Sequence, residues 1–321
     1  MLMKTIVLSL LFFFVFVIQT FAIKILHPSG YTYKVGRAPS CLTIDKKGNV
    51  WVGCKRSIAK INPTGSIIGE YKVKPSIRQI SLSASGYDIF ALSNYNIIEL
   101  NLSGKIIKRH RLPINAQYMA INGNGNIFVT SSNSIITELS PALKIVHTFY
   151  LKKRYFDGVI AISKSGDIYI ANNTFKRHSS VIKLNPRGKI IAIYNLKGYY
   201  WPLNLAIDDS RDIWIGSSWT SWIKHEVSHN TLTELNKYGH KISEYNLNPK
   251  NPIENILIDQ YGNILVLTNT ILYKLNSRGK IINKYSVQNN VLGMAIGSSG
   301  DIWISNFKRG TVTKYVKLDK K

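Results

Sequence analysis

A short phrase that recurs seven times constrains this chain more strongly than any other feature. Each copy has an apolar segment, a polar turn that usually ends in glycine, and then the general form Asn/Asp-Ile/Val-aromatic. The copies lie at Asn49-Val50-Trp51, Asp88-Ile89-Phe90, Asn126-Ile127-Phe128, Asp167-Ile168-Tyr169, Asp212-Ile213-Trp214, Asn263-Ile264-Leu265 and Asp301-Ile302-Trp303. Their Asn or Asp positions are 39, 38, 41, 45, 51 and 38 residues apart. A period of about 40 residues with several short strands per unit is typical of a β-propeller.

A second turn in each unit defines four strands. Turns of the form Gly-Lys-Ile-Ile, or a variant of it, begin at Gly65, Gly104, Leu143, Gly188, Gly239 and Gly279. Each unit is therefore predicted to contain strands a, b, c and d. The seventh unit ends at Lys321 without its last strand, and residues 27–33 repeat the pattern of residues 185–191. We predict an all-β fold, a single seven-bladed β-propeller over residues 23–321, whose ring is closed by the N-terminal strand of the mature chain.

The predicted first strands share a column of large apolar residues and a column of small ones. The large residues are Leu42, Ile80, Met119, Ile160, Leu205, Ile256 and Met294. The next position has Thr43, Ser81, Ala120, Ala161, Ala206, Leu257 and Ala295, which fits a crowded axis. Alternation with a period of two favours strands. We assign Trp51, Trp214 and Trp303 to the core, and the aspartates of the turns to local hydrogen bonds.

Residues 1–22 have the composition of a secretory signal peptide. Lys4 gives a positive start, residues 6–18 form an apolar run of 13 residues, and Thr20 and Ala22 fit a cleavage site. A membrane span needs about 20 apolar residues, so this run is short for one. We expect a secreted or periplasmic protein with a cleaved signal, and the alternative is an uncleaved N-terminal anchor.

The two cysteines, Cys41 and Cys54, flank a turn at residues 46–49. If this turn pairs Asp45 with Val50, the cysteines face each other across a hairpin. A cross-strand disulfide would then form in an oxidising compartment. The alternative is two buried thiols, because a change of one residue in the register separates them.

The repeated phrase, clearest at residues 42–67 and 160–191, resembles the NHL-repeat and streptogramin (virginiamycin B) lyase-like propellers. The resemblance extends over residues 23–321. It implies a propeller whose relatives include metal-dependent lyases, lactonase-like hydrolases and plain binding platforms, so the fold does not select an activity.

The repeat breaks in blades 4 and 5. Their b–c connections, residues 172–180 and 217–230, are longer than in the other blades, and the d–a connection between the two blades is rich in aromatic residues. Long loops on one face of a rigid ring are where function usually lies. We predict a ligand site from Tyr199, Tyr200, Trp201, Trp219, Trp222 and His178. The alternative is a rim elaboration that only caps the propeller.

Within the longest loop, His225-Glu226-Val227-Ser228-His229 matches H-E-x-x-H. On a helix this spacing places two imidazoles on one face for zinc, with the glutamate polarising a bound water. The segment lies between two predicted strands, which does not fit a metalloprotease helix. A surface metal site at His225 and His229, with His178, and solvated loop residues are the two alternatives. An enzyme would use His225, Glu226 and His229.

A second candidate site lies at the start of the first strands. Lactonase-like propellers hold a divalent cation with Glu, Asn and Asp at the channel mouth, and the resemblance implies that Asp157, Asn204, Glu254 and Asn255 correspond to such a set. Hard cations such as Mg²⁺ or Ca²⁺ prefer several oxygen ligands. The sequence has no Ser/His/Asp set that indicates a nucleophile.

The chain is strongly basic, with 42 Lys and Arg against 17 Asp and Glu, a formal net charge of +25. Its hydrophobic content of 45% excludes a disordered basic tail. The basic residues concentrate on predicted outer strands, at Lys105, Lys108, Arg109, His110, Arg111, Lys152, Lys153 and Arg154. They form either a solvated rim or a contact with anionic envelope polymer or membrane headgroups. Export disfavours nucleic acid as a partner.

Two functions remain open from the sequence. The first is an exported, monomeric binding platform that recognises a small molecule, polysaccharide or protein through the loops of blades 4 and 5. The second is a metal-dependent lyase or hydrolase with its site on the same face. A divalent metal, Zn²⁺, Mg²⁺ or Ca²⁺, belongs to the second hypothesis, and the sequence requires no other cofactor.

Overall fold

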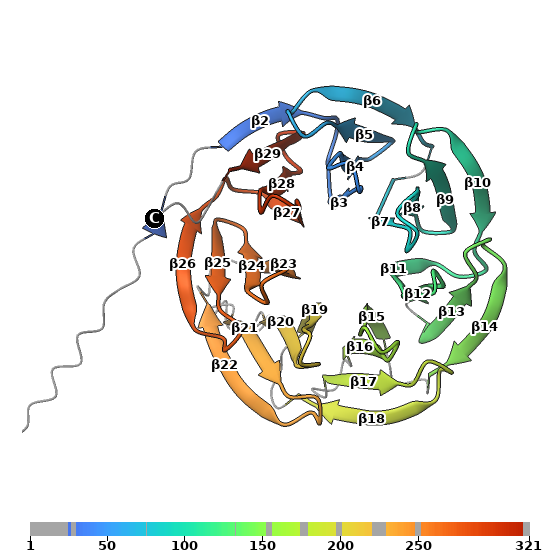
Figure 1. Ribbon diagram of the computed structural model, residues 1–321. Helices are drawn as coiled ribbons and strands as arrows, with labels where there is room; N and C mark the ends of the chain where they lie inside the picture. Colours follow the sequence, from blue (N-terminus) through green and yellow to red (C-terminus); the bar gives the residue numbers. More distant parts are fainter. Residues whose placement is uncertain are drawn as a thin grey trace, which may run out of the picture.

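The computed structural model describes residues 25–26, 30–74, 76–131, 133–151, 156–173, 179–196, 201–219, 229–247 and 252–316. These residues form seven antiparallel blades around a central channel, which confirms the predicted seven-bladed β-propeller (Figure 1). The signal peptide predicted for residues 1–22 lies outside the described residues. Within them, no helix is long and apolar enough to cross a membrane.

In each blade, strand a lies beside the channel and strand d on the outside (Figure 1). Blade 1 contains β3 (Cys41–Ile44), β4 (Val50–Gly53), β5 (Ser57–Ile61) and β6 (Ile67–Lys72). Blade 2 contains β7 (Gln79–Leu82), β8 (Asp88–Leu92), β9 (Asn96–Asn101) and β10 (Ile106–Arg111). Blade 3 contains β11 (Ala116–Ile121), β12 (Ile127–Ser131), β13 (Ile135–Leu139) and β14 (Ile145–Tyr150). Blade 4 contains β15 (Phe156–Ile162), β16 (Ile168–Asn173), β17 (Ser180–Leu184) and β18 (Ile190–Asn195). Blade 5 contains β19 (Trp201–Ile207), β20 (Ile213–Trp219), β21 (His229–Leu235) and β22 (Lys241–Leu247). Blade 6 contains β23 (Ile253–Ile258), β24 (Ile264–Thr268), β25 (Ile271–Leu275) and β26 (Ile281–Ser286), and blade 7 contains β27 (Val291–Ile296), β28 (Ile302–Asn306) and β29 (Thr311–Tyr315).

The N-terminal segment closes the ring, as predicted. β2 (Gly30–Lys34) pairs antiparallel with β29, from Gly30 opposite Tyr315 to Lys34 opposite Thr311, and supplies the fourth strand of blade 7. A short parallel strand, β1 (Ile25–Leu26), adds to β26 of blade 6, which the sequence did not indicate. β2 thus covers the edge of β29 and gives blade 7 four strands, as in the other blades.

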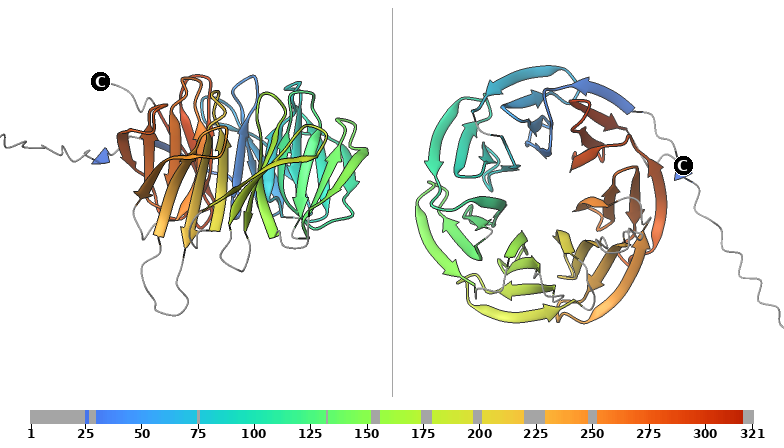
Figure 2. Two further views of the ribbon diagram at one scale, coloured as in Figure 1. Left: turned by 90° about the horizontal axis from the view of Figure 1, so that it is seen from below. Right: turned by 180° about the vertical axis from the view of Figure 1, so that it is seen from behind.

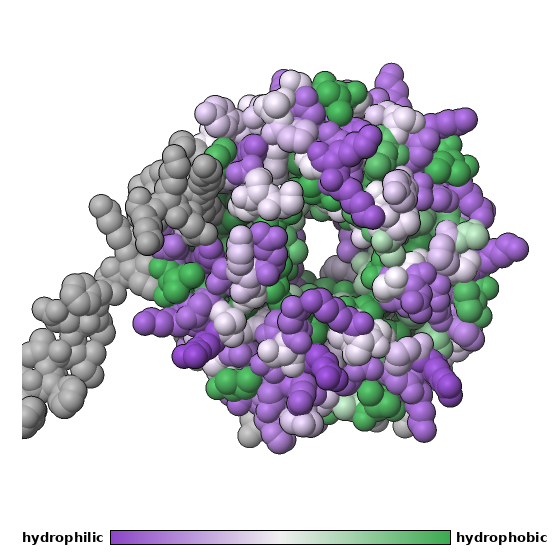
Figure 3. Space-filling view, in the orientation of Figure 1, coloured by the Kyte–Doolittle hydropathy of each residue, from purple (hydrophilic) through white to green (hydrophobic). Residues whose placement is uncertain are grey.

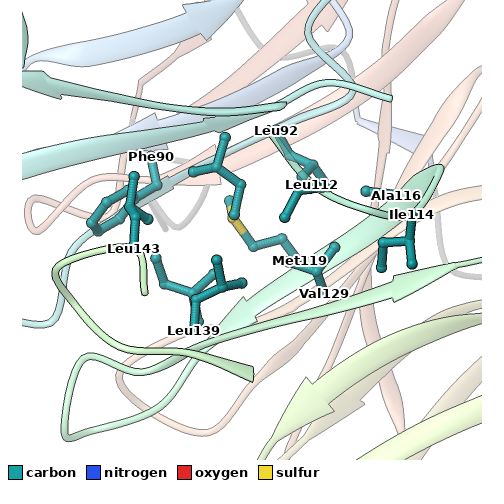
Figure 4. Close-up of a cluster of buried hydrophobic side chains, with 11 residues drawn as sticks. Phe90, Leu92, Leu112, Ile114, Ala116, Met119, Val129, Leu139 and Leu143 are labelled. Carbon is teal, nitrogen blue, oxygen red and sulfur yellow. The ribbon is translucent and has the colours of Figure 1, made fainter. Parts of the chain in front are cut away.

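The core consists of seven clusters of buried side chains, each made by two neighbouring blades. In the cluster between blades 2 and 3, Phe90 and Leu92 pack against Met119 and Leu139 (Figure 4). The predicted large column on the first strands is buried throughout. The small column also packs between blades, since Ala120 contacts the cluster of blades 3 and 4 and Ala295 lies in that of blades 7 and 1. The small side chains therefore let adjacent blades approach each other.

The a–b turns have the local hydrogen bonds predicted for them. In blade 1, Asp45 accepts from the backbone N–H groups of Lys47 and Asn49, both at 2.9 Å, and its Oδ2 accepts from Trp51 Nε1 at 3.0 Å. Asp208 accepts from Trp214 in the same way at 3.1 Å. Both tryptophans are completely buried. These acids and rings are therefore structural, as the repeat indicated.

The predicted disulfide between Cys41 and Cys54 is wrong. The turn pairs Ile44 with Val50, so Cys41 lies opposite Gly53, one residue from the expected register. Both thiols are free, and burial raises the pKa of each to about 12. Cys54 lies in the cluster between blades 7 and 1, whereas Cys41 packs against the cluster between blades 1 and 2. The shift of one residue thus places the sulfurs on different faces of the sheet.

Candidate functional site

The strands run between two ends of the ring, seen from the side in Figure 2. We call the end with the a–b and c–d turns the turn end, and the end where strand a begins the mouth end. In blades 3 to 7, a β-bulge interrupts the pairing of strands a and b at the mouth end. The extra residues include Gln117, Leu203 and Glu254. A bulge takes a residue out of the regular ladder and redirects its side chain. The ring surrounds an open central channel (Figure 3).

Two amide side chains at the mouth end connect neighbouring blades. Asn204 Nδ2 donates to the carbonyl oxygen of Ile253 at 2.8 Å, which joins the first strands of blades 5 and 6. Gln79 donates to the Met119 carbonyl and accepts from the Met119 N–H, both at 2.7 Å. At the predicted site, the side-chain N–H of Asn204 is therefore used in the contact between blades 5 and 6. Its Oδ1 has no hydrogen-bond partner among the described residues.

Glu254 is a half-buried carboxyl at the bulge of β23. Among the described residues it has no hydrogen bond or ion pair, and burial raises its pKa to about 7. Asn255, the next residue, is also half-buried. A carboxyl that titrates near neutral pH can exchange a proton with a ligand or attract a cation.

Two exposed apolar side chains lie on β19 of blade 5, the strand next to β23. Trp201 and Leu203, at the start of β19, are each 40% exposed. Leu203 is the residue at the bulge, between the pairs Pro202–Ser217 and Asn204–Gly216. The sequence pattern did not mark Leu203, because it reads as one more apolar residue of a strand. Only the bulge shows that its side chain is not in the regular ladder.

The long b–c connections of blades 4 and 5 are confirmed by the strand ends. Residues 174–179 connect β16 to β17, and residues 220–228 connect β20 to β21, whereas residues 54–56 suffice in blade 1. The hairpin of blade 5 continues to the pair Trp219–His229. His229 is thus in an extended strand. His229 therefore does not lie on a helix, whereas the zinc arrangement of H-E-x-x-H requires one.

Several predicted site residues lie outside the described part of the chain, namely His178, Tyr199, Tyr200, Trp222, His225 and Glu226. Asp157, Trp219 and His229 are placed by their backbone in β15, β20 and β21. Among the residues that are described, no group of three His, Cys, Asp or Glu side chains could hold a metal ion.

The predicted basic outer strand of blade 2 faces outward. In β10, Lys108, Arg109 and Arg111 are exposed and His110 is half-buried. Lys108 Nζ also donates to the carbonyl oxygen of Ala142 in blade 3. Part of this positive charge therefore stabilises the contact between neighbouring blades. An anionic partner for the remainder stays a prediction.

The fold has many relatives among solved structures, while no family model and no curated protein matches the chain. A streptogramin B lyase structure superimposes with a TM-score of 0.72 at 18% identity, covering 89% of this chain and 97% of that one. Hydrazine synthase of Kuenenia stuttgartiensis gives 0.77 at 12% identity, with 88% and 97% covered. The Pan2 WD40 domain of Neurospora crassa gives 0.71 at 12%, with 92% and 98% covered. These similarities show the β-propeller fold and no particular activity.

Proposed function

We propose that the protein is an exported binding platform that takes its ligand at the mouth end, over the first strands of blades 5 and 6. The observations that carry the proposal are the exposed apolar side chains of Trp201 and Leu203 on β19 and the half-buried carboxyl of Glu254 on the neighbouring strand β23. The hydrogen bond from Asn204 to Ile253 holds these two strands together. An apolar surface with a few polar groups is typical of ligand sites.

The chemistry of this surface selects a class of ligand. A sugar ring or another flat apolar group would stack on Trp201, and a hydroxyl, amine or amide on the same ligand would contact Glu254. The long connections of blades 4 and 5 begin at the same end of the ring, which supports a ligand site there. The proposed ligand is therefore a small molecule or a polysaccharide segment.

A metal-dependent lyase or hydrolase is the second candidate. The amide oxygens of Asn204 and Asn255 and the carboxyl of Glu254 are hard donors of the kind that Mg²⁺ or Ca²⁺ prefers. They occupy the first strands of neighbouring blades. The similarity to the streptogramin B lyase structure also favours this candidate.

A screen of mono- and oligosaccharides by ligand-observed NMR tests the binding platform. Trp201→Ala and Leu203→Ala should each weaken the strongest ligand at least about tenfold, the equivalent of ~1.4 kcal/mol. Tyr87→Ala, which removes a 68% exposed aromatic ring at the turn end, should have no effect. Equal loss in all three variants, or in none, would contradict the site.

Calorimetric titration with Mg²⁺, Ca²⁺ and Zn²⁺ separates the second candidate from the first. If the mouth end holds a metal, wild-type protein binds one ion and Glu254→Gln reduces the affinity at least about tenfold. Saccharide binding without any metal binding would support the binding platform and contradict the metal-dependent enzyme.

A further inference from the structure

Three residues at the turn end of blade 1 form a unit that blade 6 has only in part. In blade 1, Trp51 Nε1 donates to Asp45 Oδ2 at 3.0 Å, and Lys60 Nζ lies 4.8 Å from the centroid of the indole ring. Blades 4 and 7 repeat the contact, because Lys183 lies over Tyr169 at 5.3 Å and Lys314 over Trp303 at 5.4 Å. In each case an aromatic ring fills the space beside the lysine.

Blade 6 keeps the acid and the lysine but replaces the ring. Asp259, Leu265 and Lys274 occupy the positions of Asp45, Trp51 and Lys60. All three line a pocket of about 230 Å³ between blades 6 and 7. A cavity of about 150 Å³ can hold a benzene ring. The pocket therefore has room for the aromatic ring that this blade lacks.

Asp45 accepts a hydrogen bond from one donor that has no counterpart at Asp259. Oδ1 of Asp259 accepts from the backbone N–H groups of Tyr261 and Asn263, at 2.9 and 2.8 Å, as Asp45 does in its own turn. Oδ2 of Asp259 accepts from Asn263 Nδ2 at 2.8 Å. Asp45 Oδ2 accepts both from Asn49 Nδ2 and from the indole N–H. Among the described residues, Asp259 thus lacks the donor that the indole supplies in blade 1.

In blades 1 and 7, the lysine keeps another partner while it lies over the aromatic ring. Lys60 donates to the carbonyl oxygen of Leu102 while it lies over Trp51, and Lys314 pairs with Asp301 at 3.0 Å while it lies over Trp303. Lys274 is buried and has an interaction of its own. In this unit the ring is therefore an added cation–π contact that does not replace the existing partner of the lysine.

We propose that this pocket binds a small, flat heteroaromatic molecule with a ring N–H, of about the size of indole. The N–H donates to Asp259 Oδ2, the ring faces Lys274, and its edge contacts Leu265. Ile258 and Ile296 supply the apolar walls, and the exposed Tyr261 and Ser298 border the opening, which leaves room for a polar substituent. The site is at the turn end and is separate from the mouth end.

Indole and 1-benzofuran test this site, because both rings have the same shape and only indole has the N–H. In titrations of the full chain followed by NMR, indole should shift the signals of Ile258 and Ile296. It should bind at least about tenfold more tightly than benzofuran, since a hydrogen bond to a carboxylate is lost with the latter. Equal affinity for the two probes, or shifts elsewhere only, would overturn the proposal.

Two variants and one control complete the experiment. Leu265→Trp should fill the pocket and abolish indole binding, whereas Leu203→Trp, the same change at the mouth end, should leave it intact. Asp259→Asn keeps the pocket open and should bring the affinities for the two probes together. The Asp259→Asn variant therefore still tests the proposed site if the Leu265→Trp protein does not fold. Undiminished indole binding by a folded Leu265→Trp protein would rule the site out.

Discussion

The turn end of the ring is nearly the same in every blade, whereas the mouth end differs from blade to blade. At the turn end, all seven a–b turns form an equivalent pair of backbone hydrogen bonds, as in Asp45 N to Asn49 O at 2.9 Å and Gly48 N to Asp45 O at 2.8 Å, and only the turn of blade 2, from Ser83 to Asp88, is one residue longer. At the mouth end, the bulges in blades 3 to 7 differ in side chain, with Gln117, Leu203 and Glu254 among them. The turn end is therefore fixed by local sequence, and the mouth end can vary without loss of the fold.

The largest effect should come from disturbing the turn end at Gly104. This residue has φ of +86°, and a Cβ there would overlap the ring of Tyr71, which stacks on Trp51. Gly104→Ala should destabilise the protein by about 3 kcal/mol, because left-handed strain and overpacking add. Chemical denaturation measures this loss.

Gly300→Ala is the matched control for Gly104→Ala. Gly300 has a similar φ of +81°, but no atom lies within 4 Å of a Cβ built there. Its loss of stability should be only about 1 kcal/mol, from backbone strain alone. Equal losses in the two variants would show that packing on Tyr71 contributes nothing.

Removal of the turn carboxyl in blade 1 should have the next largest effect. Asp45→Ala leaves the buried Trp51 N–H and two backbone N–H groups of the turn without their acceptor, at a cost of about 2–3 kcal/mol. Burial opposes ionisation of Asp45, but the hydrogen bonds from Trp51, Asn49 and Lys47 outweigh it and lower its pKa. The stabilisation is thus complete above the unfolded pKa of about 3.9 and is lost as pH falls through the lower folded value. Unfolding curves from pH 2 to 7 should show a smaller acid dependence for Asp45→Ala than for wild type.

The mouth end should respond to pH in the opposite direction. Because burial raises the folded pKa of Glu254 to about 7, its contribution to stability is complete below the unfolded pKa and disappears as pH rises toward 7. Its size should be about 1–2 kcal/mol, since partial exposure to solvent reduces the effect. Glu254→Gln should remove this dependence, and a carboxyl signal in ¹³C NMR should titrate near pH 7. A midpoint near 4 would show that the carboxyl is fully solvated.

The smallest effect should be a gain in the free energy of unfolding from a substitution at the turn end. Gly297 occupies the position of Asp45 in blade 7, where Trp303 is the indole. A Cβ at Gly297 would have its nearest neighbours at 3.6 Å, an ordinary contact. Gly297→Asp should therefore give the indole an acceptor and stabilise the protein by about 1 kcal/mol. Gly297→Ala separates the hydrogen bond from the loss of glycine flexibility. No difference between the two variants in thermal unfolding would contradict the role given to the carboxylate.

The sequence alone determined the number of blades, their strand order and the closure of the ring by the segment at residues 27–33. Turns and strand alternation depend on neighbours along the chain, so the repeat shows them directly. It also showed that the aspartates and tryptophans of the repeat are structural, and it located the long connections of blades 4 and 5.

Only the tertiary structure decided features that depend on register or on contacts between blades. The pairing of Cys41 with Gly53 excluded the predicted disulfide by a shift of one residue. The exposure of Leu203 and the burial of Glu254 follow from bulges that leave no mark in the repeat. The pocket beside Leu265 exists because two neighbouring blades do not fill the space that a ring occupies elsewhere. Packing across blades joins residues far apart in the chain, and a local pattern does not contain this information.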